Sequence, residues 1–126
     1  MSKNTVCVLM STYNGEKFIR EQLDSILAQQ GEFDLNLLIR DDGSTDSTCA
    51  ILDEYTRQYS NISWYTGKNM GSCFSFLDLV YHASGYDYYA FADQDDYWLP
   101  DKIQVAIQQI HNDCPLLYTS ARSIVD

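Results

Sequence analysis

Short apolar runs alternate along this chain with segments whose apolar residues recur at helical spacing. The runs occupy residues 5–10, 35–39, 62–66 and 86–92, and another begins over 116–119. Brief apolar runs bounded by turn residues are typical of strands that are buried on both faces of a sheet. We therefore predict a β-strand at each of these positions.

Helical periodicity fills the intervals between the runs. The first predicted helix spans residues 16–29 and is ended by Gly31. Ser44 is the predicted N-cap of a second helix, which carries Asp46 in its first turn and runs to about Tyr59. The third helix is predicted to bury Phe76, Leu77 and Val80, and the fourth, which starts at Pro100, to bury Ile103, Ala106, Ile107 and Ile110.

This alternation predicts an α/β fold with an open, mostly parallel, doubly wound sheet. Right-handed crossovers between parallel strands place a helix over each strand pair, so both faces of such a sheet are covered. The 126 residues contain no internal repeat and no proline-rich linker. We therefore expect residues 1–126 to form a single domain.

The charge balance narrows the choice of partners. Eighteen acidic residues against eight basic ones give a formal net charge of −10. Nucleic acid and anionic lipid would be repelled, so no nucleic-acid partner is predicted. No apolar run approaches the roughly 20 residues that cross a bilayer, so no transmembrane segment is predicted. The four cysteines form no CxxC pair, which favours reduced thiols in a cytoplasmic protein.

Polar motifs follow three of the predicted strands. They read Ser-Thr-Tyr-Asn at 11–14, Asp-Asp-Gly-Ser at 41–44 and Asp-Gln-Asp-Asp at 93–96. Ligands of open α/β sheets bind beyond the carboxyl ends of the strands, so we expect the motifs to share one rim. Clustered carboxylates repel one another unless a cation intervenes, and oxygen ligands without histidine or cysteine favour Mg²⁺ or Mn²⁺. Such an ion would neutralise charge on a leaving diphosphate, as sugar transfer from a nucleotide requires.

Each motif also has a simpler interpretation when it is taken alone. Asp42 and Gly43 make a common turn, residues 93–96 could be a solvated loop, and Tyr13 could be a packed aromatic. Their joint placement at three strand ends favours a shared binding site. Cys73, His82 and His111 have no partner at catalytic or metal-ligand spacing, and we assign them no function.

Together with Asp-Asp-Gly-Ser-Thr-Asp at 41–46 and Asn-Met-Gly at 69–71, these motifs resemble the family 2 glycosyltransferases of GT-A fold over essentially the whole chain. The resemblance implies a nucleotide-sugar site formed by Thr12, Tyr13, Asn14, Asp41, Asp42, Asp93 and Gln94. Within this set the first three residues frame the base, and Asp41 or Asp42 reads its edge. The resemblance also implies that Asp93 and Asp95 bind the divalent cation.

Within that family, residues 10–15 and 93–100 look most like bacterial rhamnosyltransferase-type enzymes that build cell-surface polysaccharide. The resemblance implies inverting transfer from a nucleotide-diphosphate sugar to a saccharide or lipid-linked acceptor, in the cytoplasm or at the cytoplasmic face of the membrane. The general base of such enzymes is an aspartate or glutamate in the later, acceptor-binding half. That half is expected to lie beyond Asp126, so we name no catalytic base.

Three other classes of protein would also form an α/β domain of this kind. A binding-only module would hold the nucleotide-sugar without transferring it, and donor hydrolysis or transfer by a longer chain would distinguish the two. A phosphoryl-transfer or dinucleotide protein would carry GxxxxGK[ST] or GxGxxG after the first strand, and neither is present. A phosphoacceptor domain would need a lysine beside its strand-end aspartate, and no motif places Lys68 or Lys102 there.

Overall fold

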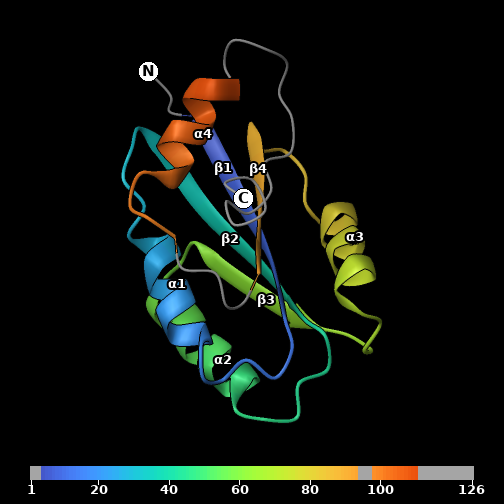
Figure 1. The fold of residues 1–126 in the computed structure, drawn as a ribbon. Coiled ribbons are helices and arrows are strands. Elements are labelled where there is room, and N and C mark those ends of the chain that lie inside the picture. Colours follow the sequence, from blue (N-terminus) through green and yellow to red (C-terminus); the bar gives the residue numbers. More distant parts are fainter. Residues whose placement is uncertain (1–3, 94–97, 111–126) are drawn as a thin grey trace.

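The computed structural model describes residues 4–93 and 98–110, which form alternating strands and helices (Figure 1). The strands are β1 (Asn4–Thr12), β2 (Phe33–Asp41), β3 (Ile62–Thr66) and β4 (Tyr88–Asp93). The helices are α1 (Ile19–Leu27), α2 (Thr48–Gln58), α3 (Ser72–His82) and α4 (Lys102–Ile110). Among these described helices, none combines the length and the apolar character needed to cross a bilayer.

The strands form a parallel sheet in the order β3-β2-β1-β4, so the direction of strand addition reverses at β1. Ser11 of β1 is aligned in register with Arg40 of β2 and with Asp93 of β4. This arrangement confirms the predicted open, parallel α/β sheet. The carboxyl ends of the strands share one edge, which we call the rim; it comprises residues 11–14, 41–44 and 67–71 together with Asp93.

One face of the sheet carries the larger hydrophobic core. Val6, Val8 and Met10 alternate along β1 and are buried against α1, α2 and α4. The helical side chains of this core include Ile19, Leu23, Ile26, Ile51, Leu52, Tyr55, Ile103 and Ile107. Each fully buried side chain of this size stabilises the fold by roughly 1.5–3 kcal/mol, so this face anchors the strands that carry the rim.

The opposite face has a smaller core, and α3 is the described helix that packs on it (Figure 1). The predicted buried face of this helix was wrong in two of its three positions. Leu77 and Val80 are 49% and 40% exposed, whereas Ser75 and Leu79 are buried and Phe76 is partly buried. Hydrophobic spacing could not identify this face, because the polar partners of Ser75 beneath the helix decide which side turns inward.

Several predicted boundaries shift where polar residues continue an element. Strands β1 and β2 extend past their apolar runs to Thr12 and Asp41, because the parallel pairing continues to the rim. Helix α2 begins at Thr48, and Ser44 does not cap it; instead the Asp46 carboxylate accepts the Thr48 N–H at 2.9 Å. Helix α1 spans Ile19–Leu27, within the predicted 16–29. The strand predicted over 116–119 lies outside the described residues.

Candidate functional site

Asp41 organises the side of the rim that faces α1 and α2. It is aligned with Thr12, whose hydroxyl donates to Asp41 Oδ1 at 2.8 Å. The backbone N–H and the hydroxyl of Ser44 donate to the same carboxylate at 2.7 and 2.6 Å. The Cys49 thiol at the start of α2 lies 3.3 Å from Oδ2. The buried Asp41 carboxylate therefore ties the turn after β2 to the end of β1 and to α2.

The thiol in this cluster is held in its neutral form. Burial and, after it, the hydrogen bond to Asp41 raise the pKa of Cys49 to about 11. A thiolate beside a carboxylate would be repelled, so the proton stays on sulfur at neutral pH. The neutral S–H group donates a hydrogen bond to Asp41. Cys7 and Cys73, the other described cysteines, also carry free thiols.

The loop after β1 is docked onto the turn after β2 through Asn14. This residue has a φ of +47°, in the left-handed region that asparagine tolerates better than most side chains. Its N–H donates to the Ser44 hydroxyl at 2.8 Å, and its side-chain oxygen accepts the Thr45 N–H at 2.8 Å. Tyr13, next to Asn14, is 45% exposed. The docking thus presents an aromatic ring at the surface of the rim, where a planar base could stack on it.

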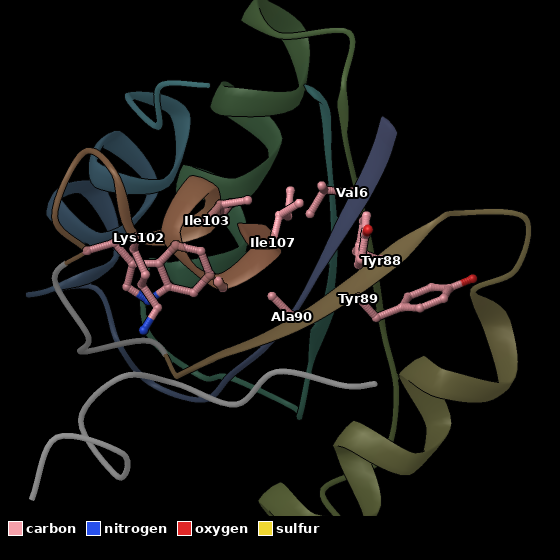
Figure 2. A pocket seen from close by; sticks show the side chains of 9 residues that line it. Val6, Tyr88, Tyr89, Ala90, Lys102, Ile103 and Ile107 are labelled. Atoms are coloured by element: carbon pink, nitrogen blue, oxygen red, sulfur yellow. The ribbon is translucent and has the colours of Figure 1, made fainter. Parts of the chain in front are cut away.

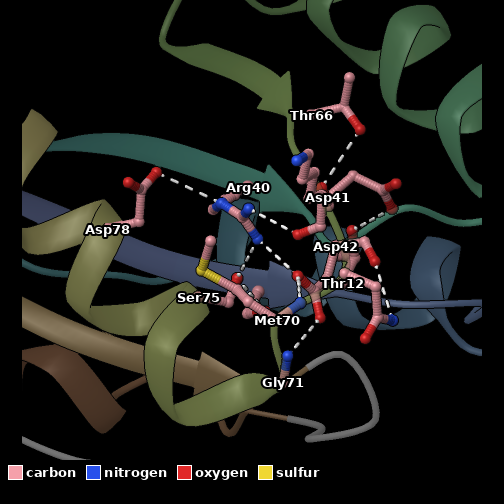
Figure 3. Close-up of polar contacts among 12 residues, drawn as sticks. Thr12, Arg40, Asp41, Asp42, Thr66, Met70, Gly71, Ser75 and Asp78 are labelled. Carbon is pink, nitrogen blue, oxygen red and sulfur yellow. Dashed lines mark hydrogen bonds and ion pairs between the residues drawn. The ribbon is translucent and has the colours of Figure 1, made fainter.

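Asp42 organises the side of the rim that faces α3 (Figure 3). Its Oδ1 accepts a hydrogen bond from Arg40 Nη1 at 2.6 Å and one from the Met70 N–H at 2.9 Å. Its Oδ2 accepts the Gly71 N–H at 3.0 Å, and its carbonyl accepts the Asn69 side-chain amide at 3.1 Å. The Asn-Met-Gly motif therefore wraps around Asp42, and Gly71 has the positive φ of 88° that favours glycine.

Arg40 is a residue of this site that the sequence analysis missed. It lies on β2 directly before the Asp-Asp-Gly-Ser motif, and its side chain is only 2% exposed. Besides Asp42, it reaches Ser75 and the Lys68 carbonyl, so it joins β2, the segment 67–71 and α3. The available signal was an arginine next to two aspartates at the end of an otherwise apolar strand.

The third predicted motif is described only at its first residue. Asp93 ends β4 and is aligned with Ser11, which confirms that the three motifs begin at one edge of the sheet. The side chain of Asp93 and all of Gln94 and Asp95 lie outside what the structure describes. Within the described residues, no group of three or more histidine, cysteine, aspartate or glutamate side chains is placed to hold a metal ion. The metal site on Asp93 and Asp95 therefore stays a prediction.

Two other features of the chain are structural. His82 Nδ1 donates to the Asp78 carbonyl at 2.8 Å, and the His82 ring centroid lies 4.9 Å from that of Tyr65. Burial and, after it, the hydrogen bond to Asp78 raise the pKa of Tyr65.

A small pocket between β4 and α4 has a volume of about 20 Å³, and its lining is apolar apart from Lys102, which lies over the Trp98 ring (Figure 2). This volume is far too small for a nucleotide.

Sequence comparison identifies relatives of the chain. The family model described as glycosyl transferase family 2 matches residues 7–125. The chain is 43% identical over 103 residues to the dTDP-rhamnosyl transferase RfbG of Shigella flexneri. This alignment covers 78% of this chain and 35% of that protein. It is 41% identical over 101 residues to an uncharacterized glycosyltransferase of Mycoplasma pneumoniae, covering 77% and 33% of the two chains. The chain thus spans about a third of the length of these curated relatives.

Solved structures have the same architecture. S. aureus TarS 1-349 in complex with UDP-GlcNAc superimposes with a TM-score of 0.71 at 28% identity, covering 89% of this chain and 32% of that one. The mannosyltransferase PcManGT from Pyrobaculum calidifontis, in complex with GDP-Man and Mn²⁺, gives a TM-score of 0.75 at 22% identity, covering 87% and 33%. The second likeness shows the fold alone. With the family model matching residues 7–125, the chain belongs to glycosyltransferase family 2.

Proposed function

We propose that this chain is the nucleotide-sugar-binding part of an inverting, metal-assisted glycosyltransferase that acts in cell-surface polysaccharide synthesis at the cytoplasmic face of the membrane. One observation carries the proposal. The ends of β1 and β2 and the segment before α3 are tied together around Asp41 and Asp42, beside the point where strand addition reverses. Ligands of open α/β sheets bind at that point, and the chain belongs to a family of sugar transferases.

In this proposal the base stacks on Tyr13, with Thr12 and Asn14 fixing the loop that presents the ring. A carboxylate offers about four acceptor positions. Those of Asp41 are taken by the hydroxyl of Thr12, the hydroxyl and N–H of Ser44 and the Cys49 thiol. Asp42 receives Arg40 and two backbone N–H groups, so among the described residues one of its acceptor positions has no protein donor and is assigned to the base, although only 3% of Asp42 is exposed. Asp42 is thus proposed to read the base edge, while Asp41 shapes the turn.

The divalent cation is proposed to bind to Asp93 and Asp95, with Gln94 between them contributing to the donor site. The backbone of Asp93 lies next to Ser11 at the rim, which supports this placement. Mn²⁺ is present in the PcManGT complex. A bound Mg²⁺ or Mn²⁺ would neutralise charge on the diphosphate of the donor. The carboxylates of Asp41 and Asp42, which accept protein donors, are left out of the metal site.

Calorimetric titration of this chain with UDP, dTDP and GDP, each with and without Mn²⁺, tests the proposal. We expect metal-dependent binding of one nucleotide, and dTDP is the first to try because the similar Shigella protein is named a dTDP-rhamnosyl transferase. Asp95→Asn should remove the effect of Mn²⁺ while leaving the urea midpoint unchanged. Absence of binding to all of the nucleotides would contradict the proposal.

A second measurement separates a transferase from a module that only binds. Release of nucleoside diphosphate from a donor sugar, with and without a saccharide or lipid-linked acceptor, reports hydrolysis or transfer. We expect release that depends on Mn²⁺ when the chain is joined to the remainder that its longer relatives possess. Tight donor binding without release in that longer protein would instead identify a nucleotide-sugar-binding module.

A further inference from the structure

Arg40 places a positive charge in the interior of the protein, directly beneath the rim. A buried guanidinium is costly unless carboxylates and hydrogen-bond acceptors surround it. Arg40 Nη1 donates to Asp42 at 2.6 Å and to the Ser75 hydroxyl at 3.1 Å, and Nη2 donates to the Lys68 carbonyl at 2.9 Å. Nε lies 3.3 Å from Asp78 Oδ2, an ion pair without hydrogen-bond geometry. One side chain thereby joins β2, the segment 67–71 and α3 (Figure 3).

The segment 67–71 is shaped to receive this guanidinium. A Cβ atom added to Gly67 would lie 2.3 Å from Arg40 Nη2 and 3.0 Å from Cζ, well inside van der Waals contact. The backbone of Gly67 is not in the left-handed region, so the position requires space rather than conformational freedom. The same segment donates the Met70 and Gly71 N–H groups to Asp42, so guanidinium, carboxylate and backbone fix one another.

We infer that Arg40 is a positioning residue for the nucleotide site, holding the Asp42 carboxylate and the segment 67–71 in the arrangement that receives the base. This inference rests on the proposed function and deepens it. The guanidinium nitrogens of Arg40 face Asp42, Ser75, the Lys68 carbonyl and Asp78, so in this inference Arg40 does not itself contact the ligand. It acts through Asp42, whose orientation it sets. Lysine cannot replace it, because a point charge cannot bridge Asp42, Ser75 and the Lys68 carbonyl as a planar fork does.

Two substitutions disturb this contact from opposite sides. Arg40→Lys keeps the charge and removes the fork, whereas Gly67→Ala keeps Arg40 and displaces its guanidinium. We expect each to weaken nucleotide binding by roughly tenfold or more, as loss of an orienting partner or a small misplacement commonly does. Each should also speed hydrogen exchange at the Met70 and Gly71 amides. In the double variant the two losses should not add, because both act on one contact.

Leu79→Ala is the matched control for stability. Leu79 is fully buried on α3 and packs on the same face of the sheet, but it donates nothing to Asp42. We expect this variant to lower the urea midpoint and to bind nucleotide within about twofold of the parent when compared at equal fraction folded. Asp78→Asn, at a carboxylate that is 33% exposed and also accepts the Tyr65 hydroxyl, loosens the Nε end of Arg40 but leaves its contact with Asp42, and should weaken binding by less than Arg40→Lys.

The outcomes separate this inference from the proposed function. If the parent chain binds no nucleotide, both the proposed function and the inference are contradicted. If the parent binds and Arg40→Lys, Gly67→Ala and Asp78→Asn all retain its affinity at equal fraction folded, only the inference is overturned. Weakened binding with faster exchange at Met70 and Gly71, in variants that remain folded, supports a positioning role, since stability loss alone would affect Leu79→Ala equally.

Discussion

Asp41 and Asp42 are neighbours in sequence, yet they stabilise opposite sides of the rim with different partners. Asp41 accepts hydrogen bonds from neutral groups, namely hydroxyls, a thiol and the N–H of Ser44. Asp42 accepts two backbone N–H groups and the buried cation of Arg40. Charge-assisted bonds are stronger, and an unpaired buried charge is far more costly than an unpaired hydroxyl. Loss of the carboxylate is therefore expected to lower the free energy of unfolding more at Asp42 than at Asp41.

The largest effect is expected from Asp42→Asn. It would leave Arg40 buried without its nearest counterion and should lower the free energy of unfolding by about 3–5 kcal/mol. Urea denaturation measures the loss, and calorimetry should show that nucleotide binding is abolished in the protein that remains folded. A double variant Arg40→Leu with Asp42→Leu should regain part of the stability but none of the binding. A loss below about 1 kcal/mol in the single variant would mean that the pair is not desolvated.

Asp41→Asn should cost less, about 1–3 kcal/mol, because it leaves hydroxyl, thiol and N–H donors short of an acceptor without exposing an unpaired charge. The same urea experiment measures it. We expect the turn at 41–44 to loosen, which hydrogen exchange at the Ser44 amide would report. Equal losses for Asp41→Asn and Asp42→Asn would show that the nature of the partners does not govern the difference between the two sides.

Tyr13→Ala tests the loop that follows β1, where Tyr13 is 45% exposed. Stacking of a base on an aromatic side chain contributes about 1–3 kcal/mol, so nucleotide affinity should fall by about five- to 150-fold. The loss of stability should be smaller than in Asp41→Asn, since about half of Tyr13 is exposed. Tyr13→Phe is the control and should keep most of the affinity. Unchanged affinity in Tyr13→Ala would place the base elsewhere on the rim.

At neutral pH the smallest effect is expected from Cys49 beside Asp41, because its titration changes stability only in alkaline solution. Its pKa rises from 9.0 to about 11 in the folded protein, so folding favours the protonated thiol. The contribution is complete below pH 9.0 and is lost as the pH rises to about 11, because the unfolded chain releases this proton first. The parent should therefore lose more stability over this interval than Cys49→Ser does. If the free energy of unfolding depended on pH in the same way in both proteins, the Cys49 thiol would not contribute to the pH dependence.

The sequence predicted the elements that are set by local periodicity and turn chemistry. Strand β3 matches its predicted range of 62–66, and the buried residues of α4 include Ile103, Ala106 and Ile107 as expected. The shared edge of the sheet was predicted because parallel strands align their carboxyl ends, and the register of Ser11 with Asp93 confirms it. Roles of single residues in nucleotide and metal binding remain predictions.

Only the tertiary structure decided which polar groups meet. The sequence determined a parallel α/β sheet with acidic motifs at its strand ends, because hydrophobic period and strand-end chemistry are local properties. Apart from Arg40, the partners of Asp42 are distant in the sequence: Met70 is 28 residues away along the chain, and Arg40 itself reaches Ser75 across 35 residues. Such pairings follow from the packing of α3 on the sheet, which also leaves Leu77 and Val80 exposed. Long-range packing, which no local pattern encodes, thus placed Arg40 beneath the rim and turned Ser75 toward it.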